Sequence, residues 1–262
     1  LLAAGSIEFG LGSNSFIPLN MAAAGVPARA VMASFQKDPQ VLIAHPDQGV
    51  DSLGDMVGRP IFLADASIGA FWVWLKARHE FSDDQIRKYT FNNAPFIANP
   101  DAIQQGYVTS EPYTIERQAG WAPKVFLLAD YGYPSYGAMI LAADAVIEAE
   151  PGVVQDFVDA SIEGWISYLN GDPAGADALI MADNPDMTED VLAQAREKLV
   201  SYGIVESGDA FGAGIGVMTH ARWAKFFAVM AANGVYERTL PIEDAYTLQF
   251  VGGGPEEAPL EE

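Results

Sequence analysis

Glu111 is the residue whose surroundings in the sequence best suit contact with a ligand. It follows Thr109-Ser110 and precedes Pro112, so it lies where a predicted strand turns into a helix. A carboxylate at such a junction accepts hydrogen bonds from an amine, and it forms a two-bond pair with a protonated ring. An acidic residue in the first turn of a helix is also favoured by the helix dipole alone. The sequence therefore predicts either a ligand partner or a helix-stabilising residue at this position.

Short polar segments between predicted strands and helices are further candidates for ligand binding. Ser13 and Asn14 lie in one such segment, and Asp65 and Ser67 lie in another. Hydroxyls and free backbone N–H groups at the start of a helix can face a ligand, although the same residues also serve as helix caps. Asn92 ends a predicted strand and offers amide donors and acceptors, although an asparagine there also forms turns.

Aromatic residues fall into two groups with different expected roles. Trp72 belongs to a predicted helix whose apolar face forms core, and it could also stack on a flat ligand. Tyr133 and Tyr136 lie in a segment broken by glycine and proline, where phenols need polar partners. They are predicted either to face a ligand or to hold the connection between two parts of the chain.

The chain has none of the sequence patterns that mark common catalytic sites. There is no cysteine, which excludes thiol nucleophiles, disulfides and cysteine-bound metal. The three histidines are scattered, and no nucleophile-elbow or phosphate-loop pattern occurs. We therefore expect no catalytic residue, no cofactor and no bound metal.

The composition indicates a packed globular protein that avoids polyanions. Half of the 262 residues are apolar, and the formal net charge is -21. Such a charge argues against nucleic acid or an anionic membrane as a partner. No apolar run is long enough to span a bilayer. The first five residues resemble the end of a helix that enters a strand, so we expect an upstream segment that this sequence lacks.

Strands and helices are predicted to alternate in the first half of the chain. This pattern favours open, mostly parallel sheets covered by helices, and thus an α/β fold. The predicted strands are residues 7–11, 29–35, 40–44, 60–64, 88–91, 124–127 and 138–141. The predicted helices include residues 68–79, a capped turn at Ser82–Gln85 and a helix beginning at Asn99-Pro100.

The second half is predicted to be mainly helical. Apolar residues recur at helical spacing over 151–169, 188–202 and 219–233. Residues 252–262 are rich in glycine and glutamate, which predicts a solvated acidic tail.

Several motifs that occur together along nearly the whole chain carry a family resemblance. They are Gln36-Lys37-Asp38-Pro39-Gln40, Tyr89-Thr90-Phe91-Asn92, Gln104 through Tyr113, Ala160 through Trp165, Gly208-Asp209-Ala210 and Gly214 through Thr219. Together they resemble the NMT1/THI5-like solute-binding proteins, which also serve importers of nitrate, taurine and thiamine precursors. Family members begin with a strand and a helix that precede the point where this sequence starts, and we expect such a segment upstream.

The resemblance implies a periplasmic binding protein-like fold of type II, with two α/β lobes joined by a hinge. It implies chain crossings near 57–61 and 130–136. Residues 1–59 are then the first part of lobe one, 60–129 are lobe two, and 130–251 are the hinge return and the helix-rich remainder of lobe one. Ligands of such sheets bind beyond the carboxyl ends of the strands, in the cleft between lobes.

The resemblance also implies a function. We expect a monomeric periplasmic protein that captures a small heteroaromatic, pyrimidine-like ligand for the permease of an ABC importer in the inner membrane. Taurine, an alkanesulfonate or nitrate is the alternative ligand, and an enzyme of pyrimidine biosynthesis on this fold is the alternative function. The implied ligand-binding residues are Ser13, Asn14, Phe35, Gln36, Asp65, Ser67, Trp72, Asn92, Glu111, Tyr113, Tyr133 and Tyr136.

Overall fold

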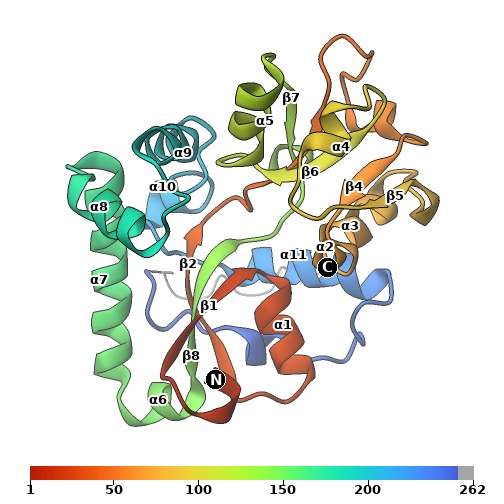
Figure 1. Cartoon of the computed structure of the whole chain (residues 1–262). Coiled ribbons are helices and arrows are strands. Elements are labelled where there is room, and N and C mark those ends of the chain that lie inside the picture. Colours follow the sequence, from red (N-terminus) through yellow and green to blue (C-terminus); the bar gives the residue numbers. More distant parts are fainter. Residues whose placement is uncertain (253–262) are drawn as a thin grey trace.

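A computed structural model describes residues 1–252 and has two separate β-sheets (Figure 1). The smaller sheet has the order β1-β8-β2, with β1 at Phe9–Asn14, β8 at Gly137–Ala143 and β2 at Ala28–Phe35. β8 runs antiparallel to both of its neighbours. The predicted tail at 252–262 lies, except for its first residue, outside the described residues.

The larger sheet has five strands in the order β5-β4-β6-β3-β7. Their bounds are β3 Gln40–Ala44, β4 Ile61–Leu63, β5 Ile86–Lys88, β6 Ile103–Tyr107 and β7 Lys124–Leu127. β4 is parallel to β5 and β6, whereas β3 is antiparallel to β6 and β7. The prediction of mostly parallel sheets is therefore wrong. β3 and β8 each follow a strand of the other sheet, with no α-helix between the two strands. Each of them runs antiparallel to both of its neighbours in the sheet that it enters.

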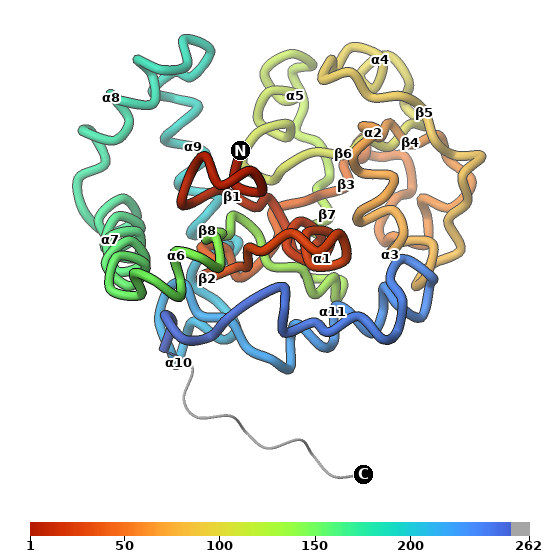
Figure 2. The backbone as a smooth tube through the Cα atoms, turned by 90° about the horizontal axis from the view of Figure 1, so that it is seen from below, coloured from red at the N-terminus to blue at the C-terminus, as the bar shows by residue number. Residues whose placement is uncertain are grey.

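Helices surround both sheets (Figures 1 and 2). The α-helices are α1 Phe16–Ala23, α2 Asp65–Ile68, α3 Phe71–Arg78, α4 Ala94–Ile97, α5 Glu111–Ala119, α6 Asp144–Ala149, α7 Pro151–Asn170, α8 Ala174–Asp183, α9 Glu189–Ser201, α10 Ala210–Ala213 and α11 His220–Ala232. Short 3-10 helices are η1 Leu2–Ala4, η2 Leu53–Met56, η3 Asp83–Gln85, η4 Leu128–Tyr131 and η5 Ile242–Ala245. We call the three-stranded sheet with α1 and α6 to α11 the first lobe, and the five-stranded sheet with α2 to α5 the second lobe.

The chain changes sheets twice, through two connections that we call the crossovers. The first runs between Phe35, which ends β2, and Gln40, which begins β3. The second runs between Leu127 and Gly137 and contains η4. The predicted first crossing at 57–61 is wrong, because β3 already pairs with β6 and β7 of the five-stranded sheet. Residues 40–59 therefore belong to the second lobe.

Local expectations around β5 and β6 need correction as well. The expected helix at Asn99-Pro100 is absent, and α4 ends at Ile97. The chain instead enters β6 at Ile103, the strand expected before Glu111, to which the sequence pattern assigned no bounds. The capping box at Ser82 and Gln85 is confirmed, at the start of η3.

The hydrophobic core extends across the second crossover. The Tyr133 ring lies 5.2 Å from the Trp74 ring of the second lobe and 6.3 Å from the Phe226 ring of the first. Trp72 and Trp74 are fully buried in the same core. This shared core holds the two lobes against each other along the side where α3 meets α11.

Candidate functional site

Glu111 lies at the carboxyl end of β6, as the first residue of α5. Its Oε2 accepts a 2.8 Å hydrogen bond from the Tyr107 backbone N–H. Its Oε1 accepts a 3.4 Å hydrogen bond from the Tyr89 hydroxyl. The close approach depends on Gly106, because a Cβ there would lie 2.7 Å from the Glu111 Cβ. The carboxylate is thus held in place while its side chain remains partly exposed.

This end of β6 adjoins the first crossover, so Glu111 lies near the junction of the lobes. The Val108 N–H donates to the Pro39 carbonyl at 2.9 Å, and Tyr107 pairs with Gln40 across the β3–β6 ladder. Parallel strands β4, β5 and β6 end at this same edge. Their carboxyl ends are where ligands of open α/β sheets bind.

A buried amide network supports the position of Glu111. The Asn93 Oδ1 accepts from the Gln104 Nε2 at 2.9 Å and from the Tyr89 hydroxyl at 3.3 Å. The Asn93 Nδ2 donates to the Thr114 hydroxyl at 3.1 Å. The neighbouring residue that the sequence favoured, Asn92, instead accepts from the Ala94 N–H in an exposed turn. Asn93, and not Asn92, therefore supports the position of Glu111. The two asparagines differ in burial, which the sequence does not reveal.

Tyr89, Phe91 and Tyr107 lie at this carboxyl edge of the sheet, and the Tyr89 side chain contacts the carboxylate. The Tyr89 ring lies 5.2 Å from the ring of Phe91, which is 77% exposed, and Tyr107 is 43% exposed. Burial, together with the charge of Glu111, raises the pKa of Tyr89. Burial and the charges of Asp38 and Glu111 raise the pKa of Tyr107 to about 12. Both hydroxyls therefore keep their protons at neutral pH and remain donors.

In the first lobe, Ser13, Asn14 and Phe35 lie at the ends of β1 and β2. The Asn14 side chain accepts a 3.1 Å hydrogen bond from the N–H of Phe16, the first residue of α1, whereas Ser13 is exposed. The Phe35 ring meets the Trp165 ring edge-on at 5.3 Å.

Arg222 of α11 connects both crossovers. Its guanidinium donates to the carbonyl of Gln36 in the first crossover and to those of Pro134 and Ser135 in the second, the last two at 3.1 and 3.2 Å. It also lies 4.1 Å from the centre of the Tyr136 ring. One partly buried side chain thereby donates to three backbone carbonyls from two separate segments.

Asp38 is a buried carboxyl in the first crossover. Its Oδ1 accepts from the Gln40 N–H at 3.0 Å. Burial raises the pKa of Asp38 from 3.8 to about 7, against the opposing effects of the Gln40 N–H, the Ser135 hydroxyl and the Arg222 charge. The group therefore titrates near neutral pH.

Several residues expected at the ligand site instead have internal partners. Tyr136 is buried, accepts from the Thr219 N–H at 2.9 Å and donates to Asp209 at 3.3 Å. Tyr133 is buried in the shared core, and the Gln36 amide donates to the Val217 carbonyl at 2.8 Å. These three residues stabilise the crossovers, which was the alternative role for the tyrosines.

The remaining candidates also lie apart from Glu111 or are otherwise engaged. The expectation that Trp72 stacks on a ligand is wrong, because its ring is fully buried and its indole N–H donates to Asp83 at 2.8 Å. Asp65 pairs with Lys88 at 2.9 Å, and Ser67 is buried in α2. The Tyr113 hydroxyl donates to the carboxylate of Asp190 in α9.

Two cavities lie away from Glu111. One of about 430 Å³ lies against both crossovers and is lined by residues that include Gln36, Tyr133 and Arg222. The other, of about 440 Å³, is mainly apolar and lies between α9 and α10. Within residues 1–252, no three acidic or histidine side chains are grouped so that they could hold a metal ion. None of the described helices is both long and apolar enough to cross a membrane.

The two lobes joined by paired crossovers define a protein of the periplasmic binding protein fold. Residues 1–176 match the family described as NMT1/THI5 like, and the chain belongs to this family. This confirms the resemblance found in the sequence motifs.

Three similar proteins illustrate the range of functions on this fold. The riboflavin-binding protein RibY of Chloroflexus aurantiacus is 23% identical over 236 residues, which cover 88% of this chain. The chain spans only 66% of the length of that relative. The periplasmic aliphatic sulphonate-binding protein SsuA from Escherichia coli has a TM-score of 0.71 at 15% identity, over 100% of this chain and 82% of SsuA. The desulfurization enzyme DSZB has a TM-score of 0.56 at 14% identity, over 92% of this chain and 83% of DSZB.

Proposed function

We propose that this chain is the ligand-capturing part of a periplasmic solute-binding protein that serves the permease of an ABC importer. The ligand is a planar nitrogen heterocycle that contains a pyrimidine ring, held between the two lobes without chemical change. The family and the two-lobe fold support the binding function. Domain closure around a ligand is a common motion of this architecture.

The observation that carries the ligand class is the fixed carboxylate of Glu111 beside exposed aromatic rings. Two donors orient the carboxylate, from Tyr107 and Tyr89. A carboxylate in this position attracts ring N–H and amine donors and repels anions. Riboflavin, which the relative RibY is named for binding, also contains a pyrimidine ring within its flat flavin.

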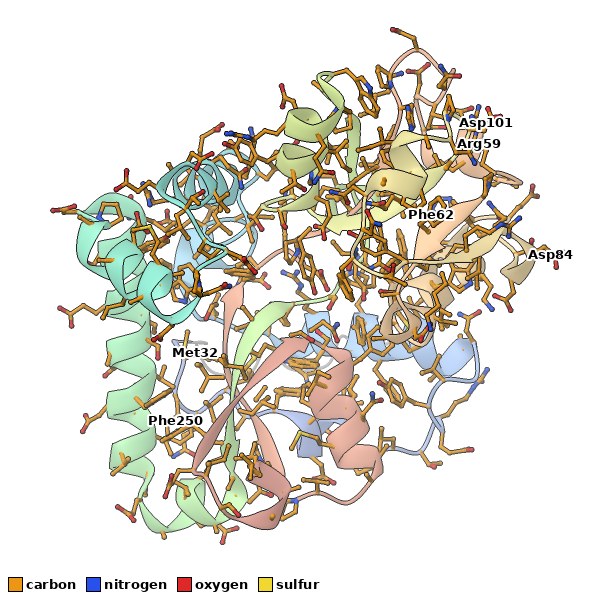
Figure 3. All side chains as sticks on the ribbon, viewed as in Figure 1. Met32, Arg59, Phe62, Asp84, Asp101 and Phe250 are labelled. Carbon is orange, nitrogen blue, oxygen red and sulfur yellow. The ribbon has the colours of Figure 1, made fainter. Side chains whose placement is uncertain are left out.

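An anionic ligand such as a sulfonate, taurine or nitrate would need a free cation near this carboxyl edge. Three basic residues of the second lobe are engaged in ion pairs with acidic residues. Arg117 pairs with Asp190, and Lys124 pairs with Asp51. Arg59 pairs with Asp101 at 3.6 Å, at the outer end of the second lobe (Figure 3). Lys88 ends β5 at this carboxyl edge and pairs with Asp65 at 2.9 Å. With these cations paired and the Glu111 carboxylate fixed at the same edge, a ligand that donates hydrogen bonds is favoured over an anion.

An enzymatic function on the same fold is the other candidate, since DSZB is an enzyme. The chain lacks cysteine and any recognised catalytic pattern. Incubation with pyridoxal phosphate distinguishes the pyrimidine-synthesis alternative. We expect no absorbance band of a lysine-bound cofactor, and the appearance of such a band would favour the enzyme.

A thermal-shift screen tests the proposed ligand class. The panel holds hydroxymethylpyrimidine, formylaminopyrimidine, thiamine, riboflavin, cytosine, taurine, nitrate and an alkanesulfonate. A ligand at 100 times its Kd adds about 2.7 kcal/mol of stability, which is readily measured as a rise in Tm. We expect a pyrimidine-containing compound to raise the Tm. A shift with only sulfonate, taurine or nitrate would contradict the ligand class.

Glu111→Gln is the matched test of the carboxylate. The amide keeps the size of the side chain but loses the charge, so we expect about 10-fold or greater weakening of ligand binding. Glu116→Gln is the control, because Glu116 is exposed on the same helix. Equal affinities of Glu111→Gln and wild type would remove the carboxylate from the proposed site.

A further inference from the structure

Phe91 has an unusual backbone conformation that the packing of the protein does not explain. Its φ is +60°, in the left-handed region that glycine and asparagine adopt more easily than a bulky aromatic residue. The following residues are asparagines, so a residue better suited to this φ lies directly next to it in the sequence. The strain nevertheless falls on the phenylalanine.

Burial does not compensate for this strain. The Phe91 side chain is 77% exposed, although a phenylalanine in a folded protein usually buries most of its ring. Strained residues of this kind persist where the surroundings hold them, and they occur often at ligand sites. An exposed and strained aromatic residue therefore indicates a role outside the folding core.

The position of the ring connects it to Glu111. Phe91 follows β5 at the same carboxyl edge where β6 leads into α5. Its ring lies 5.2 Å from the Tyr89 ring at an angle of 49°. The Tyr89 hydroxyl in turn reaches the Glu111 carboxylate at 3.4 Å. An aromatic face and a fixed acceptor thus flank the same tyrosine.

We propose that Phe91 is the stacking residue of the Glu111 site, and that its strained backbone presents the ring to a planar heteroaromatic ligand. This inference rests on the proposed function and specifies its site. The ligand ring lies against the Phe91 face in an offset or edge-on arrangement, with ring centres about 4.5–7 Å apart. An amine or ring N–H of the ligand then donates to Glu111. The site would therefore select ligands that have both a flat ring and a hydrogen-bond donor at the edge of that ring.

Three substitutions separate the ring from the backbone conformation. Phe91→Gly relieves the strain and removes the ring, Phe91→Ala removes the ring and keeps a Cβ, and Phe91→Trp keeps an aromatic face. Phe211→Ala is the control, because Phe211 is equally exposed, at 81%, on α10 of the other lobe. Binding of riboflavin and of hydroxymethylpyrimidine is measured by isothermal titration calorimetry, and the Tm is measured without ligand.

We expect Phe91→Ala and Phe91→Gly to weaken binding of at least one probe by about 10-fold, while Phe91→Trp and Phe211→Ala stay within about 3-fold of wild type. Without ligand, Phe91→Gly should melt higher than Phe91→Ala, because glycine adopts this φ without strain. Wild-type affinity in Phe91→Ala would overturn the stacking role and leave the proposed function intact. If the wild type bound neither probe but bound a sulfonate, the proposed ligand class itself would be overturned.

Discussion

The Tyr113 hydroxyl donates a 2.5 Å hydrogen bond to the Asp190 carboxylate, and this bond joins α5 of the second lobe to α9 of the first. Arg117 donates to the same carboxylate oxygen at 2.7 Å. One turn farther along α9, the Gln194 amide donates to the Thr109 carbonyl at 2.6 Å. The hydrogen bonds of Thr188 and Tyr113, with the Arg117 charge, lower the pKa of Asp190 to about 2. The lobes are thus linked here by polar contacts outside the crossovers, beside a buried apolar cluster that includes Leu199 of α9 and Ile115 of α5.

Tyr113→Phe and Asp190→Asn should each favour separation of the lobes with little effect on folding. The contacts are exposed, and exposed ion pairs contribute little to stability. They nevertheless exist only when α5 and α9 are adjacent, so their loss shifts the population toward an open form. We expect a larger radius of gyration by small-angle X-ray scattering, weaker ligand binding and a nearly unchanged Tm.

Asp186→Asn is the control for this linkage, because Asp186 is an exposed acid just before α9. It should leave the scattering profile and the affinity at their wild-type values. An unchanged radius of gyration in both Tyr113→Phe and Asp190→Asn would show that the α5–α9 contact does not hold the lobes together.

Arg222→Met should destabilise the whole protein. The substitution leaves the buried carbonyls of Gln36 and Pro134 without this donor, leaves the Ser135 carbonyl with only the Asp38 N–H, and removes the positive charge near Asp38. Such losses typically cost about 3 kcal/mol. The free energy of unfolding from urea denaturation measures the effect. Lys225→Met, one turn away on the exposed face of α11, should change this value by less than about 0.5 kcal/mol.

The Asp38 carboxyl should make stability depend on pH in an unusual direction. Burial raises its pKa to about 7 in the folded state, above the value of the unfolded chain. The folded state therefore binds more protons than the unfolded state between about pH 4 and pH 7, and stability falls as the pH rises through this range. Below the range the neutral carboxyl contributes its full stability. Above the range that contribution is lost, up to about 4 kcal/mol.

Asp38→Asn removes this titration and keeps an oxygen that can accept from the Gln40 N–H. Comparison of the variant with wild type isolates one group from the repulsion among the other acidic residues. We expect the unfolding free energy of the variant relative to wild type to increase between pH 4 and pH 8. A constant difference over this range would mean that Asp38 keeps an ordinary pKa in the folded protein.

Local sequence patterns predicted those elements that are determined by local physics. The run Gln40–Ala44 is apolar enough to mark β3 with its observed bounds, and Ser82 with Gln85 marks a capping box. The bounds of β6 could not be found in this way, because two adjacent glutamines interrupt its apolar pattern. Gln104 donates to Asn93 and Gln105 accepts from the Ala64 N–H, so both are buried with partners distant in the sequence.

The first crossover could not be predicted from the sequence, because its position also depends on contacts between residues distant in the chain. Membership of a sheet depends on which strands pair, and β3 pairs with β6 and β7, more than fifty residues later. No local signal in 36–39 distinguishes a crossover from an ordinary loop.

Phe91 was not a candidate in the sequence analysis, because the residue type alone indicates neither its φ nor its exposure. Glu111 was singled out from a local feature, an acidic residue between Thr109-Ser110 and Pro112, and its role toward a ligand stays a prediction.

Gly106→Ala should disturb Glu111 without touching the carboxylate directly. The added methyl group would lie 2.7 Å from the Glu111 Cβ and 2.8 Å from the Ile43 Cδ1, closer than packed side chains permit. Ile43 is fully buried in β3, so Glu111 at the start of α5 is the side that yields. We expect a loss of about 1–3 kcal/mol in the free energy of unfolding and weaker ligand binding.

Gly164→Ala is the control, because Gly164 lies in the exposed middle of α7 with open space around its Cβ position. That substitution should raise stability by about 0.5–1 kcal/mol through helix propensity alone and leave binding unchanged. Wild-type stability and affinity in Gly106→Ala would show that the junction of β6 and α5 adapts freely, and the carboxylate would then not be held where the proposed site needs it.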